Sequence, residues 1–395
     1  MIVAGAGPGG AVAAREAARR GLATLLLERR RELGTPLACA EAVRRAGFDR
    51  LTAVDPAWIA SSIDGGRLIT PDGTAAVLAH PDAGMTLERP LFERHLAAEA
   101  AAAGAYVLVD CPARDLVQDK GRVTGVVVRV GGKERAVGAE VVIAADGVES
   151  NLAVKAGLAS PLPRDEVYAC AQFLVTGPEA EWDVAPAYAD FLVGNRVAPG
   201  GYGWRFPKGR GRWNVGVAVT PGAAGGENPT AILRRLFAST LPGARILGYM
   251  VGAIPVPAAP GPFAAAGLLL VGDAARLTEP LSGAGIAIAM ESGILAAAAA
   301  ADAIGRGDMS ARGLAGYEER WRSERGREVA FYARARAFFR RLADRDLDRI
   351  GRALARIVEE RAAIGEGIGS PFDLGRSLVT ADPRLLLLGR HLLAA

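Results

Sequence analysis

Five residues near the start of the chain have the types and the spacing of a dinucleotide-binding turn. Four glycines follow a short apolar strand and open an alanine-rich helix, namely Gly5, Gly7, Gly9 and Gly10. Gly5 suits a tight turn, the central glycines let backbone N–H groups approach a pyrophosphate, and Gly10 allows close packing of strand and helix. The helix N-terminus adds a positive dipole, and Glu28, which ends the second strand, can accept both hydroxyls of a ribose. An acid at this position predicts FAD or NAD rather than NADP.

Two later strand ends carry carboxylates that suit the same kind of ligand. In VVIAADGVES a strand ends at Asp146, and in LLLVGDAARLTEPLSGAGI another ends at Asp273. Asp273 could accept a hydrogen bond from a ribityl hydroxyl, while Gly283 and Gly285 would let backbone N–H groups face the carbonyls of a flavin pyrimidine ring. Either segment alone also fits an ordinary strand-to-loop junction. Together with the N-terminal glycines, the two segments favour a flavin.

The elements that must hold these residues alternate between strands and helices. Apolar strands at 2–4 and 24–27 and a helix at 89–103 are typical of a nucleotide-binding αβ domain. After residue 113, runs of valine separated by Lys-Gly and Gly-Gly pairs predict a β-meander. Residues 166–255 are mostly strand-like, broken by proline and glycine and by one helix.

These elements predict a mixed α/β (α+β) fold with three regions. A Rossmann-like FAD-binding domain is discontinuous in sequence, because an antiparallel β-sheet substrate domain is inserted into it, and a helical region ends the chain. The expected FAD-binding segments are residues 1–60, 86–160 and 256–305. The substrate domain is expected at 61–85 and 161–255, and the C-terminal helical region at 306–395.

The composition argues against several other classes of protein. The 395 residues, half of them apolar, are enough for two or three domains with a large core. The net charge is +4, but arginines are intermixed with acids, so nucleic-acid binding is not expected. Three separated cysteines and three histidines indicate no disulfide framework, no metal site and no histidine-activated nucleophile.

Membrane-spanning and secretion segments are not expected either. The most apolar run, residues 283–305, is interrupted by Glu291, so we interpret it as a buried helix. A signal peptide is not expected, since the nucleotide-binding strand begins at residue 2. Because that strand is short, we expect a few residues to precede Met1 in the natural chain.

The three signatures in this order resemble the FAD-dependent hydroxylase superfamily. PLACAEAV and YGWRFPKG (Tyr202–Gly209) narrow the resemblance to the geranylgeranyl reductase family, which includes archaeal digeranylgeranylglycerophospholipid reductases and bacterial reductases of isoprenoid or menaquinone tails. The resemblance spans essentially the whole chain, including RPLFERHL and LAGYEERW. One residue departs from the family pattern, because Ala42 stands where the family usually has glycine after the loop's glutamate.

The resemblance implies an FAD cofactor and assigns residues to it. Gly9 would contact the pyrophosphate and Glu28 the ribose. Arg89, which opens RPLFERHL, would lie near the cofactor, and Ala113 would pack against the adenine through its backbone. The remaining residues that it places along the flavin are Cys39, Ala40, Ala42, Asp273, Gly285 and Ile286.

The reaction that the resemblance implies is saturation of isolated C=C bonds in a geranylgeranyl or other polyprenyl chain. Hydride would come from N5 of the reduced flavin, and the protein would position the alkene, exclude water and supply a proton. Cys39 is a candidate proton donor or flavin-tuning group, or else a small buried side chain without chemistry. Glu41 is a second candidate acid, since a desolvated carboxyl can stay protonated, but it would equally suit a helix cap. Cys111 and Cys170 are expected to be structural.

An aromatic strand is the candidate substrate surface. Tyr202, Trp204 and Phe206 alternate, so their side chains should share one strand face. That face is either the core of a sheet or the wall of a long apolar pocket. Lys208, one of only four lysines, could bind a phosphate or diphosphate headgroup.

The partners implied are a polyprenyl lipid and an external electron donor. A second glycine fingerprint is lacking, so no separate NAD(P)H domain is expected, and the reductant would be visiting NAD(P)H or a ferredoxin. Residues 331–358 carry apolar and arginine side chains at helical spacing, which suits packing on the domain or contact with an anionic membrane. The expected location is the cytoplasm, with possible peripheral contact at the inner face of the cell membrane.

Three other functions stay open at this point. The first is an FAD-dependent monooxygenase or halogenase on the same scaffold, which a strict oxygen requirement would indicate. The second is a non-redox flavoprotein such as a prenyl cyclase or isomerase, marked by turnover without net electron consumption. The third is a flavin-binding protein without catalysis. The loop with Cys39 and the GWRFPKG segment favour the reductase.

Overall fold

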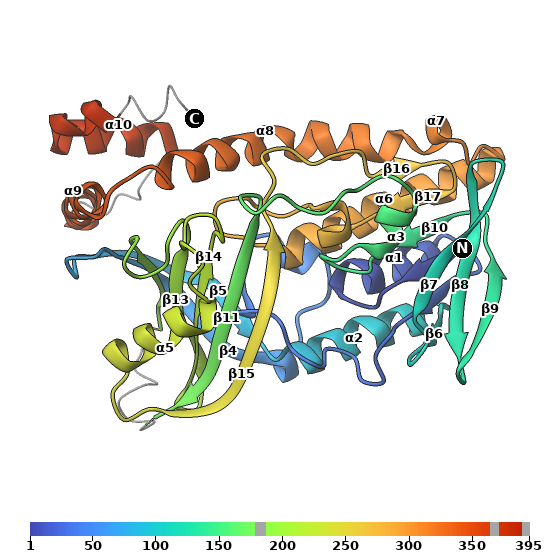
Figure 1. Ribbon diagram of the computed structural model, residues 1–395, viewed down its shortest axis with the longest axis horizontal. Coiled ribbons are helices and arrows are strands. Elements are labelled where there is room, and N and C mark those ends of the chain that lie inside the picture. Colours follow the sequence, from blue (N-terminus) through green and yellow to red (C-terminus); the bar gives the residue numbers. More distant parts are fainter. Residues whose placement is uncertain (178–186, 364–370, 389–395) are drawn as a thin grey trace.

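The computed structural model describes residues 1–177, 187–363 and 371–388, and Figure 1 shows its elements spread along one long axis. Short strands and the helices packed on them lie at the end that holds the N-terminus, and a large sheet lies toward the opposite end. Helix α8 (Gly316–Phe339) runs along both parts. Its Tyr317 hydroxyl donates to Leu270 O in the first part, and its Arg336 donates to Asp165 O beside the second.

A parallel sheet of short strands forms the nucleotide-type part. Its strand order is β16 (Ala264–Ala265), β17 (Leu268–Leu270), β10 (Val142–Ala144), β1 (Ile2–Ala4), β2 (Leu25–Leu27) and β6 (Tyr106–Leu108). Every pairing is parallel except that of β16 with β17. Strands β1, β10 and β17 are fully buried, as expected where both sheet faces are covered. The parallel direction brings Gly5, Glu28 and Asp146 to one edge, at the carboxyl ends of β1, β2 and β10.

Helices α1 (Pro8–Arg19) and α6 (Ile286–Arg306) pack directly against each other through glycine. A Cβ atom on Gly293 would lie 2.3 Å from Gly9 O, and one on Gly9 would lie 2.8 Å from Ala289 O. Among the described residues, α6 is the one helix long and apolar enough to cross a membrane by length and composition. Its packing on α1 agrees with the predicted buried helix.

A second sheet, called the large sheet below, lies beside the loop that carries Cys39. Its order is β15 (Arg245–Pro255), β11 (Val167–Thr176), β14 (Arg212–Val219), β13 (Tyr202–Gly209), β12 (Ala189–Val193), β4 (Ile59–Ile69), β5 (Ala75–Leu87) and β3 (Ala42–Arg44). Its pairs are antiparallel, apart from the parallel pairing of β12 with β4. Helix α5 (Pro229–Thr240) covers one face, where Phe173, Val217 and Leu233 form a separate core. The opposite face carries Trp204 and faces the candidate site.

A third, three-stranded sheet confirms the predicted β-meander. Its strands β7 (Ala113–Asp119), β8 (Arg122–Val130) and β9 (Lys133–Gly138) pair antiparallel in sequence order. The second turn is Gly131-Gly132, and both residues have positive φ, which glycine adopts without strain. Between β2 and β4 the chain forms β3 and two 3-10 turns, η1 (Phe48–Arg50) and η2 (Pro56–Trp58).

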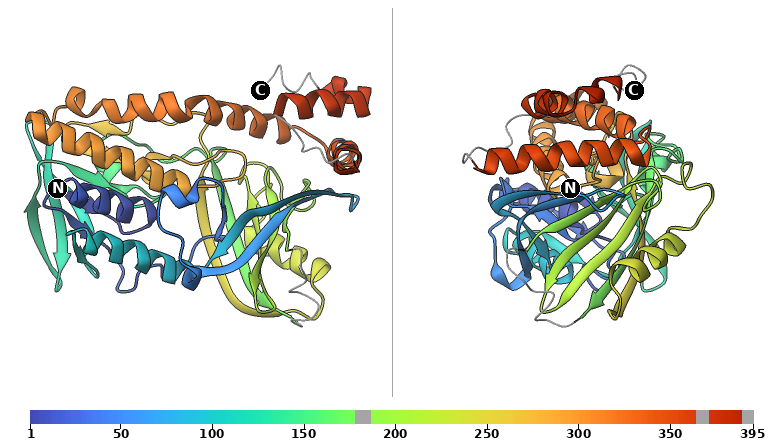
Figure 2. Two further views of the ribbon diagram at one scale, coloured as in Figure 1. Left: turned by 180° about the vertical axis from the view of Figure 1, so that it is seen from behind. Right: turned by 90° about the vertical axis from the view of Figure 1, so that its left-hand side faces the viewer.

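Helices dominate the described C-terminal part, as predicted. In chain order the elements are α7 (Ala311–Leu314), α8, α9 (Asp344–Ala363), α10 (Pro371–Ala381) and the 3-10 segment η4 (Pro383–Leu388). Figure 2 shows α9 lying across the strands of the β4–β5 hairpin. There the backbone N–H of Asp72 donates to Asp348 at 2.9 Å, and Arg352 forms an ion pair with the Asp72 carboxylate. These contacts attach the helical region to the large sheet.

Candidate cofactor and substrate site

The turn between β1 and α1 has a backbone that requires glycine at two places. Gly5 has φ of +110°, and its N–H donates to Leu27 O at 2.7 Å. A Cβ atom on Gly5 would lie 2.2 Å from Ala145 O, and one on Gly10 would lie 1.9 Å from Gly5 O. The contacts agree with the roles predicted for both, a tight turn at Gly5 and close strand–helix packing at Gly10.

Gly7 and Gly9 have different surroundings. A Cβ atom on Gly7 would meet no atom within 4 Å, and Gly7 is the N-cap of α1, whose cap has no side-chain hydrogen bond. A side chain at Gly7 would therefore stand in open space at the N-terminus of α1, where a helix of this length can bind a pyrophosphate. Gly9 instead lies against Ala289 of α6, so its missing side chain serves helix packing. Contact of the Gly9 backbone with pyrophosphate stays a prediction.

Glu28 is held rigidly at the carboxyl end of β2. Its Oε2 accepts the N–H of Ala6 in the glycine turn at 2.9 Å, and its Oε1 accepts the N–H of Arg30 at 2.9 Å. Each carboxylate oxygen can accept a second hydrogen bond, so both remain able to receive a ribose hydroxyl. The structure thus places the predicted acid directly beside the predicted phosphate turn.

Two buried carboxylates lie at the other strand ends. Asp146 Oδ2 accepts the N–H of Leu152 at 3.1 Å, while its Oδ1 is buried without a partner, and burial raises the pKa of Asp146. Burial also raises the pKa of Asp273 to about 6, although the positive charge of Arg89 opposes this shift. Buried polar groups normally have hydrogen-bond partners, so the unpartnered Oδ1 of Asp146 indicates a ligand with hydroxyl or amide donors.

The loop before α6 completes this edge. Gly285 is the N-cap of α6, Ile286 is its first residue, and a Cβ on Gly285 would lie 3.4 Å from Asp273 Oδ1. Gly283 has φ of +73°, and a Cβ there would lie 3.1 Å from Ile254 Cδ1. The N-terminus of a 21-residue helix therefore faces the same space as the Asp273 carboxylate. The open space at Gly7, the unpartnered Oδ1 of Asp146 and the Asp273 carboxylate beside Gly285 fit FAD.

Cys39 lies beside Arg89, which begins helix α2 (Arg89–Ala102). Its Sγ accepts the N–H of Glu41 at 3.2 Å. Burial raises the pKa of Cys39 against the opposing charge of Arg89, so the thiol is protonated near neutral pH. The positive charge of Arg89 opposes the raised pKa of both Cys39 and Asp273.

Glu41 has the contacts of a structural acceptor. It is 1% exposed, and its Oε1 accepts the N–H of Arg89 at the start of α2 at 3.1 Å. Its Oε2 accepts from Asn214 Nδ2 at 2.9 Å and pairs with Lys208 Nζ at 2.7 Å. Of the two predicted roles these contacts favour the helix cap, although the helix is α2 rather than one that follows directly in sequence. A proton-donating role for Glu41 stays a prediction without structural support.

Lys208 is buried in an ion pair and does not reach a headgroup. The residue is 2% exposed, and its Nζ lies 2.7 Å from Glu41 Oε2 and 3.1 Å from Glu88 Oε2. It also donates to Leu87 O. Three acceptors already surround this ammonium group, so the predicted binding of a phosphate headgroup by Lys208 stays a prediction without structural support. The sequence pattern around Lys208 contains neither carboxylate, which is why the pairing was missed.

The aromatic side chains of β13 share one face, as predicted. Ring centroids of Tyr202 and Trp204 lie 5.9 Å apart, and those of Trp204 and Phe206 lie 6.3 Å apart. Trp204 and Phe206 are each 4% exposed, and Trp204 Nε1 donates to Gln172 Oε1 at 2.9 Å. These two form sheet core, whereas Tyr202 lines a cavity. The aromatic face is therefore sheet core at Trp204 and Phe206 and cavity wall at Tyr202.

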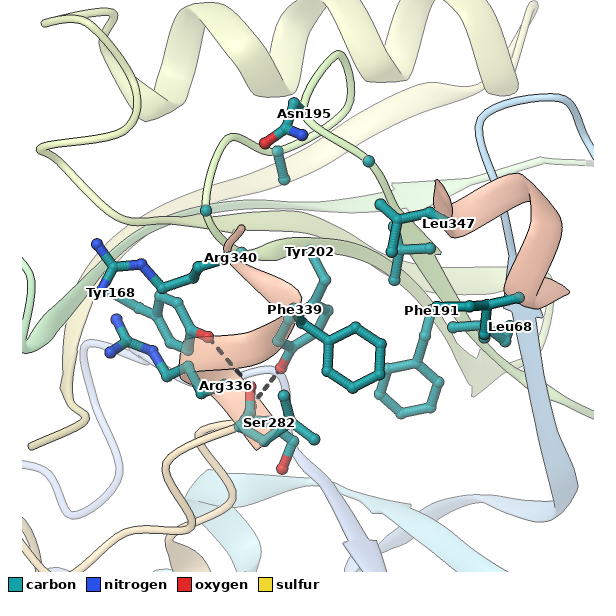
Figure 3. A pocket seen from close by; sticks show the side chains of 17 residues that line it. Leu68, Tyr168, Phe191, Asn195, Tyr202, Ser282, Arg336, Phe339, Arg340 and Leu347 are labelled. Atoms are coloured by element: carbon teal, nitrogen blue, oxygen red, sulfur yellow. Dashed lines mark hydrogen bonds between the residues drawn. The ribbon is translucent and has the colours of Figure 1, made fainter. Parts of the chain in front are cut away.

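The cavity lies between the large sheet and helices α8 and α9 (Figure 3). Its volume is about 230 Å³, many times the roughly 10–15 Å³ that one water needs. The walls are mainly apolar and aromatic, and the side chains that Figure 3 shows around the opening include Leu68, Phe191, Tyr202, Phe339 and Leu347. An apolar cavity of this kind suits a hydrocarbon chain.

Two tyrosines connect this cavity to the loop before α6. Tyr168 donates to Leu281 O at 3.1 Å, and Tyr202 donates to Ser282 O, as the dashed lines in Figure 3 show. Burial raises the pKa of both tyrosines, so each hydroxyl keeps its proton and acts as a donor. Cys170, on the same face of β11, has its pKa raised to about 12 by burial and by the neighbouring Cys39. Gln172, also on β11, donates to Cys39 O at 3.3 Å, so the Cys39 loop contacts the strand that carries Tyr168.

Three further residues that were predicted to contact the cofactor are alanines. Ala40 and Ala42 pack against the aromatic cluster of the large sheet, and Ala113 is the first residue of β7. Sequence reasoning missed Tyr168, Gln172 and Asn214 because nothing near them in sequence marks their contacts. Alternation along β11 is the only local signal that would have placed Tyr168, Cys170 and Gln172 on one face.

Family models match two parts of the chain. Residues 1–201 match an FAD binding domain, and residues 166–254 match a geranylgeranyl reductase catalytic domain. A digeranylgeranylglycerophospholipid reductase from Methanothrix thermoacetophila is 39% identical over 399 aligned residues, covering 99% of this chain and 98% of the relative.

Solved structures agree with this similarity. A geranylgeranyl bacteriochlorophyll reductase-like protein from Thermoplasma acidophilum superimposes with a TM-score of 0.89 at 32% identity, covering 99% of this chain and 98% of that chain. A myxobacterial chondrochloren halogenase, CndH, has a TM-score of 0.69 at 20% identity, covering 96% of this chain and 95% of that chain. The halogenase likeness shows a shared fold alone.

Proposed function

The chain belongs to the geranylgeranyl reductase family, and from this premise we propose that it uses FAD to saturate C=C bonds in the geranylgeranyl chains of a glycerophospholipid. The single observation that carries the substrate is the apolar cavity, whose tyrosines bond to the loop before α6. A hydrocarbon chain in this cavity would lie beside the loop before α6, which carries Gly283 and Gly285.

The cofactor would be held at the carboxyl ends of the strands of the parallel sheet, beside the loop before α6. The first turn of α1 at Gly7 would bind the pyrophosphate, and Glu28 would bind the adenosine ribose. Asp273 would accept from a ribityl hydroxyl, with Arg89 and the loop before α6 beside the ring system. Bound FAD, once reduced, supplies the hydride that alkene saturation needs.

The protein's own part is to position the alkene, exclude water and hold a proton. Cys39 is the proton donor that the contacts support best, because burial keeps its thiol protonated and its loop contacts β11, the strand that carries Tyr168. Trp204 and Phe206 give the neighbouring wall a dry, rigid surface. A fixed alkene near a protonated thiol needs little reorganisation before reaction.

The electron donor and the membrane contact are further parts of the proposal. Reducing equivalents would come from NAD(P)H or a ferredoxin. Leu386 and Leu387 on η4 are 64% and 68% exposed, and Phe331 on the arginine-rich α8 is 45% exposed. Apolar side chains beside arginines suit the headgroup region of an anionic membrane, where a lipid substrate would be collected. Co-sedimentation with phosphatidylglycerol vesicles but not with phosphatidylcholine vesicles would support this contact.

The test of the proposed reaction is anaerobic incubation of dithionite-reduced enzyme with digeranylgeranylglycerophospholipid, followed by mass spectrometry. The expected product gains hydrogen in pairs. Geranylgeranyl diphosphate and a prenylated quinone, run in parallel, show the substrate preference. No mass change without air, together with oxygen or halogen incorporation in air, would instead support the monooxygenase or halogenase alternative.

A further inference from the structure

Two arginines of α8, one helical turn apart, line the apolar cavity. Arg336 lies 4.8 Å from the ring centroid of Tyr168 and donates to Asp165 O at 2.8 Å. Its Nε is buried and has no hydrogen-bond partner. Arg340 lies next to it, with Nη1 3.4 Å from the same carbonyl oxygen. Figure 3 shows both side chains beside Tyr168, at one side of the cavity.

Arg336 differs from the other buried basic side chains in lacking a carboxylate partner. In the part of the chain that the structure describes, the fully buried basic residues are Arg15, Lys208 and Arg336. Arg15 pairs with a glutamate at 2.7 Å, and Lys208 pairs with Glu41 at 2.7 Å. Within the same ranges, neither Arg336 nor Arg340 has an ion-pair partner; their acceptors are backbone carbonyls and a hydroxyl.

Two neighbouring guanidinium groups are unfavourable beside an apolar cavity when, among the described residues, no carboxylate forms an ion pair with either of them. Burial and the adjacent charge of Arg336 lower the pKa of Arg340, although the negative charge of Asp165 opposes this shift. Uncompensated charge in such surroundings is costly, and an anion placed between the two groups would relieve it. The guanidinium fork matches the oxygens of a phosphate better than those of any neutral group.

We propose that Arg340, with Arg336, binds the phosphate of a prenyl lipid whose hydrocarbon chain occupies the cavity. The inference rests on the proposed function and adds the residues that recognise the headgroup, in place of Lys208. Arg336 is anchored by Asp165 O and Thr220 Oγ1 and also positions Tyr168. Arg340 is less tightly held and is the residue to change. The phosphate would then lie at the α8 side, with the chain running toward Tyr202.

The test measures binding to the oxidised, FAD-loaded protein, so turnover is not required. Geranylgeranyl diphosphate and geranylgeraniol are compared by equilibrium dialysis in the same detergent. Arg340→Gln is expected to weaken binding of the diphosphate about tenfold and to leave binding of the alcohol within about twofold. Arg340→Lys should recover part of the loss. The matched control is Arg334→Gln, which removes the same charge from an exposed position on α8 and should change neither affinity.

Three results would overturn the inference. They are equal weakening of both ligands, no weakening of either, and the same loss in Arg334→Gln as in Arg340→Gln. If inorganic pyrophosphate binds as tightly as geranylgeranyl diphosphate, the claim that the ligand is a prenyl lipid is also overturned. An unchanged FAD content and circular-dichroism spectrum show that Arg340→Gln is folded. If the diphosphate binds through Arg340 but no substrate is reduced, the proposed function fails while this inference stands.

Discussion

Replacing Lys208 with methionine tests the buried ion pair that joins β13 to the Cys39 loop. We expect Lys208→Met to lower the free energy of unfolding by about 3–5 kcal/mol, which is typical when one partner of a buried pair is removed. Methionine keeps most of the side-chain length and removes the charge. Glu41, 1% exposed, then loses an ammonium partner at 2.7 Å, whereas Glu88 keeps Arg212 at 2.9 Å. The uncompensated charge is therefore confined to Glu41.

The double variant Lys208→Met with Glu41→Gln removes both charges. We expect its free energy of unfolding to return to within about 1–2 kcal/mol of the starting protein, because the amide oxygen can still accept from Asn214. The assay is urea unfolding of the parent, both single variants and the double variant at one saturating FAD concentration. The four free energies give the coupling between the two side chains.

The control is Lys155→Met, which breaks a solvent-exposed pair with Asp115 of similar length, 2.9 Å. A surface pair of this kind contributes about 1 kcal/mol or less. A loss below about 0.5 kcal/mol in Lys208→Met, or a coupling to Glu41 near zero, would refute the buried ion pair and reopen Lys208 as a headgroup ligand.

Three further predictions follow from the cofactor edge. Gly7→Val should lose FAD, as seen in the absorbance spectrum, and should leave the melting temperature of the FAD-free protein nearly unchanged. Gly9→Val should instead lower that melting temperature, because the valine would push α6 away. A yellow, fully loaded Gly7→Val would contradict the assignment of the pyrophosphate site. Cys39→Ala should retain FAD and slow alkene reduction about 100-fold, measured against Cys111→Ala, whereas unchanged turnover would make Cys39 structural. Burial raises the pKa of Asp273 from 3.8 to about 6, so in this pH interval the folded, FAD-free protein binds a proton that the unfolded chain has released. The free energy of unfolding of the FAD-free protein should therefore fall as pH rises from about 4 to 6. Asp273→Asn should abolish that slope and raise the free energy of unfolding by up to about 3 kcal/mol at pH 7. An identical slope in urea titrations of the variant would refute the raised pKa of Asp273.

The glycine turn, the β-meander and the buried character of α6 were all predictable from the sequence. Each depends on residues within a few positions of one another. Gly5, Gly131 and Gly132 all have positive φ, which favours glycine. The apolar run of α6 is long enough to form a helix of 21 residues. Local backbone conformation and periodicity are properties of short segments, so they are visible without the fold.

The partners of the site residues were decided only by the tertiary structure. Asn214 reaches Glu41 across 173 positions, and Arg336 reaches Asp165 across 171. Lys208 looked free in sequence and is buried between two carboxylates, and Gly9 is needed by α6 as well as by the turn. The sequence alone determined which residue types can bind FAD and line an apolar strand face. Which charges are neutralised and which remain for a ligand depends on side chains that only the folded chain brings within hydrogen-bond distance.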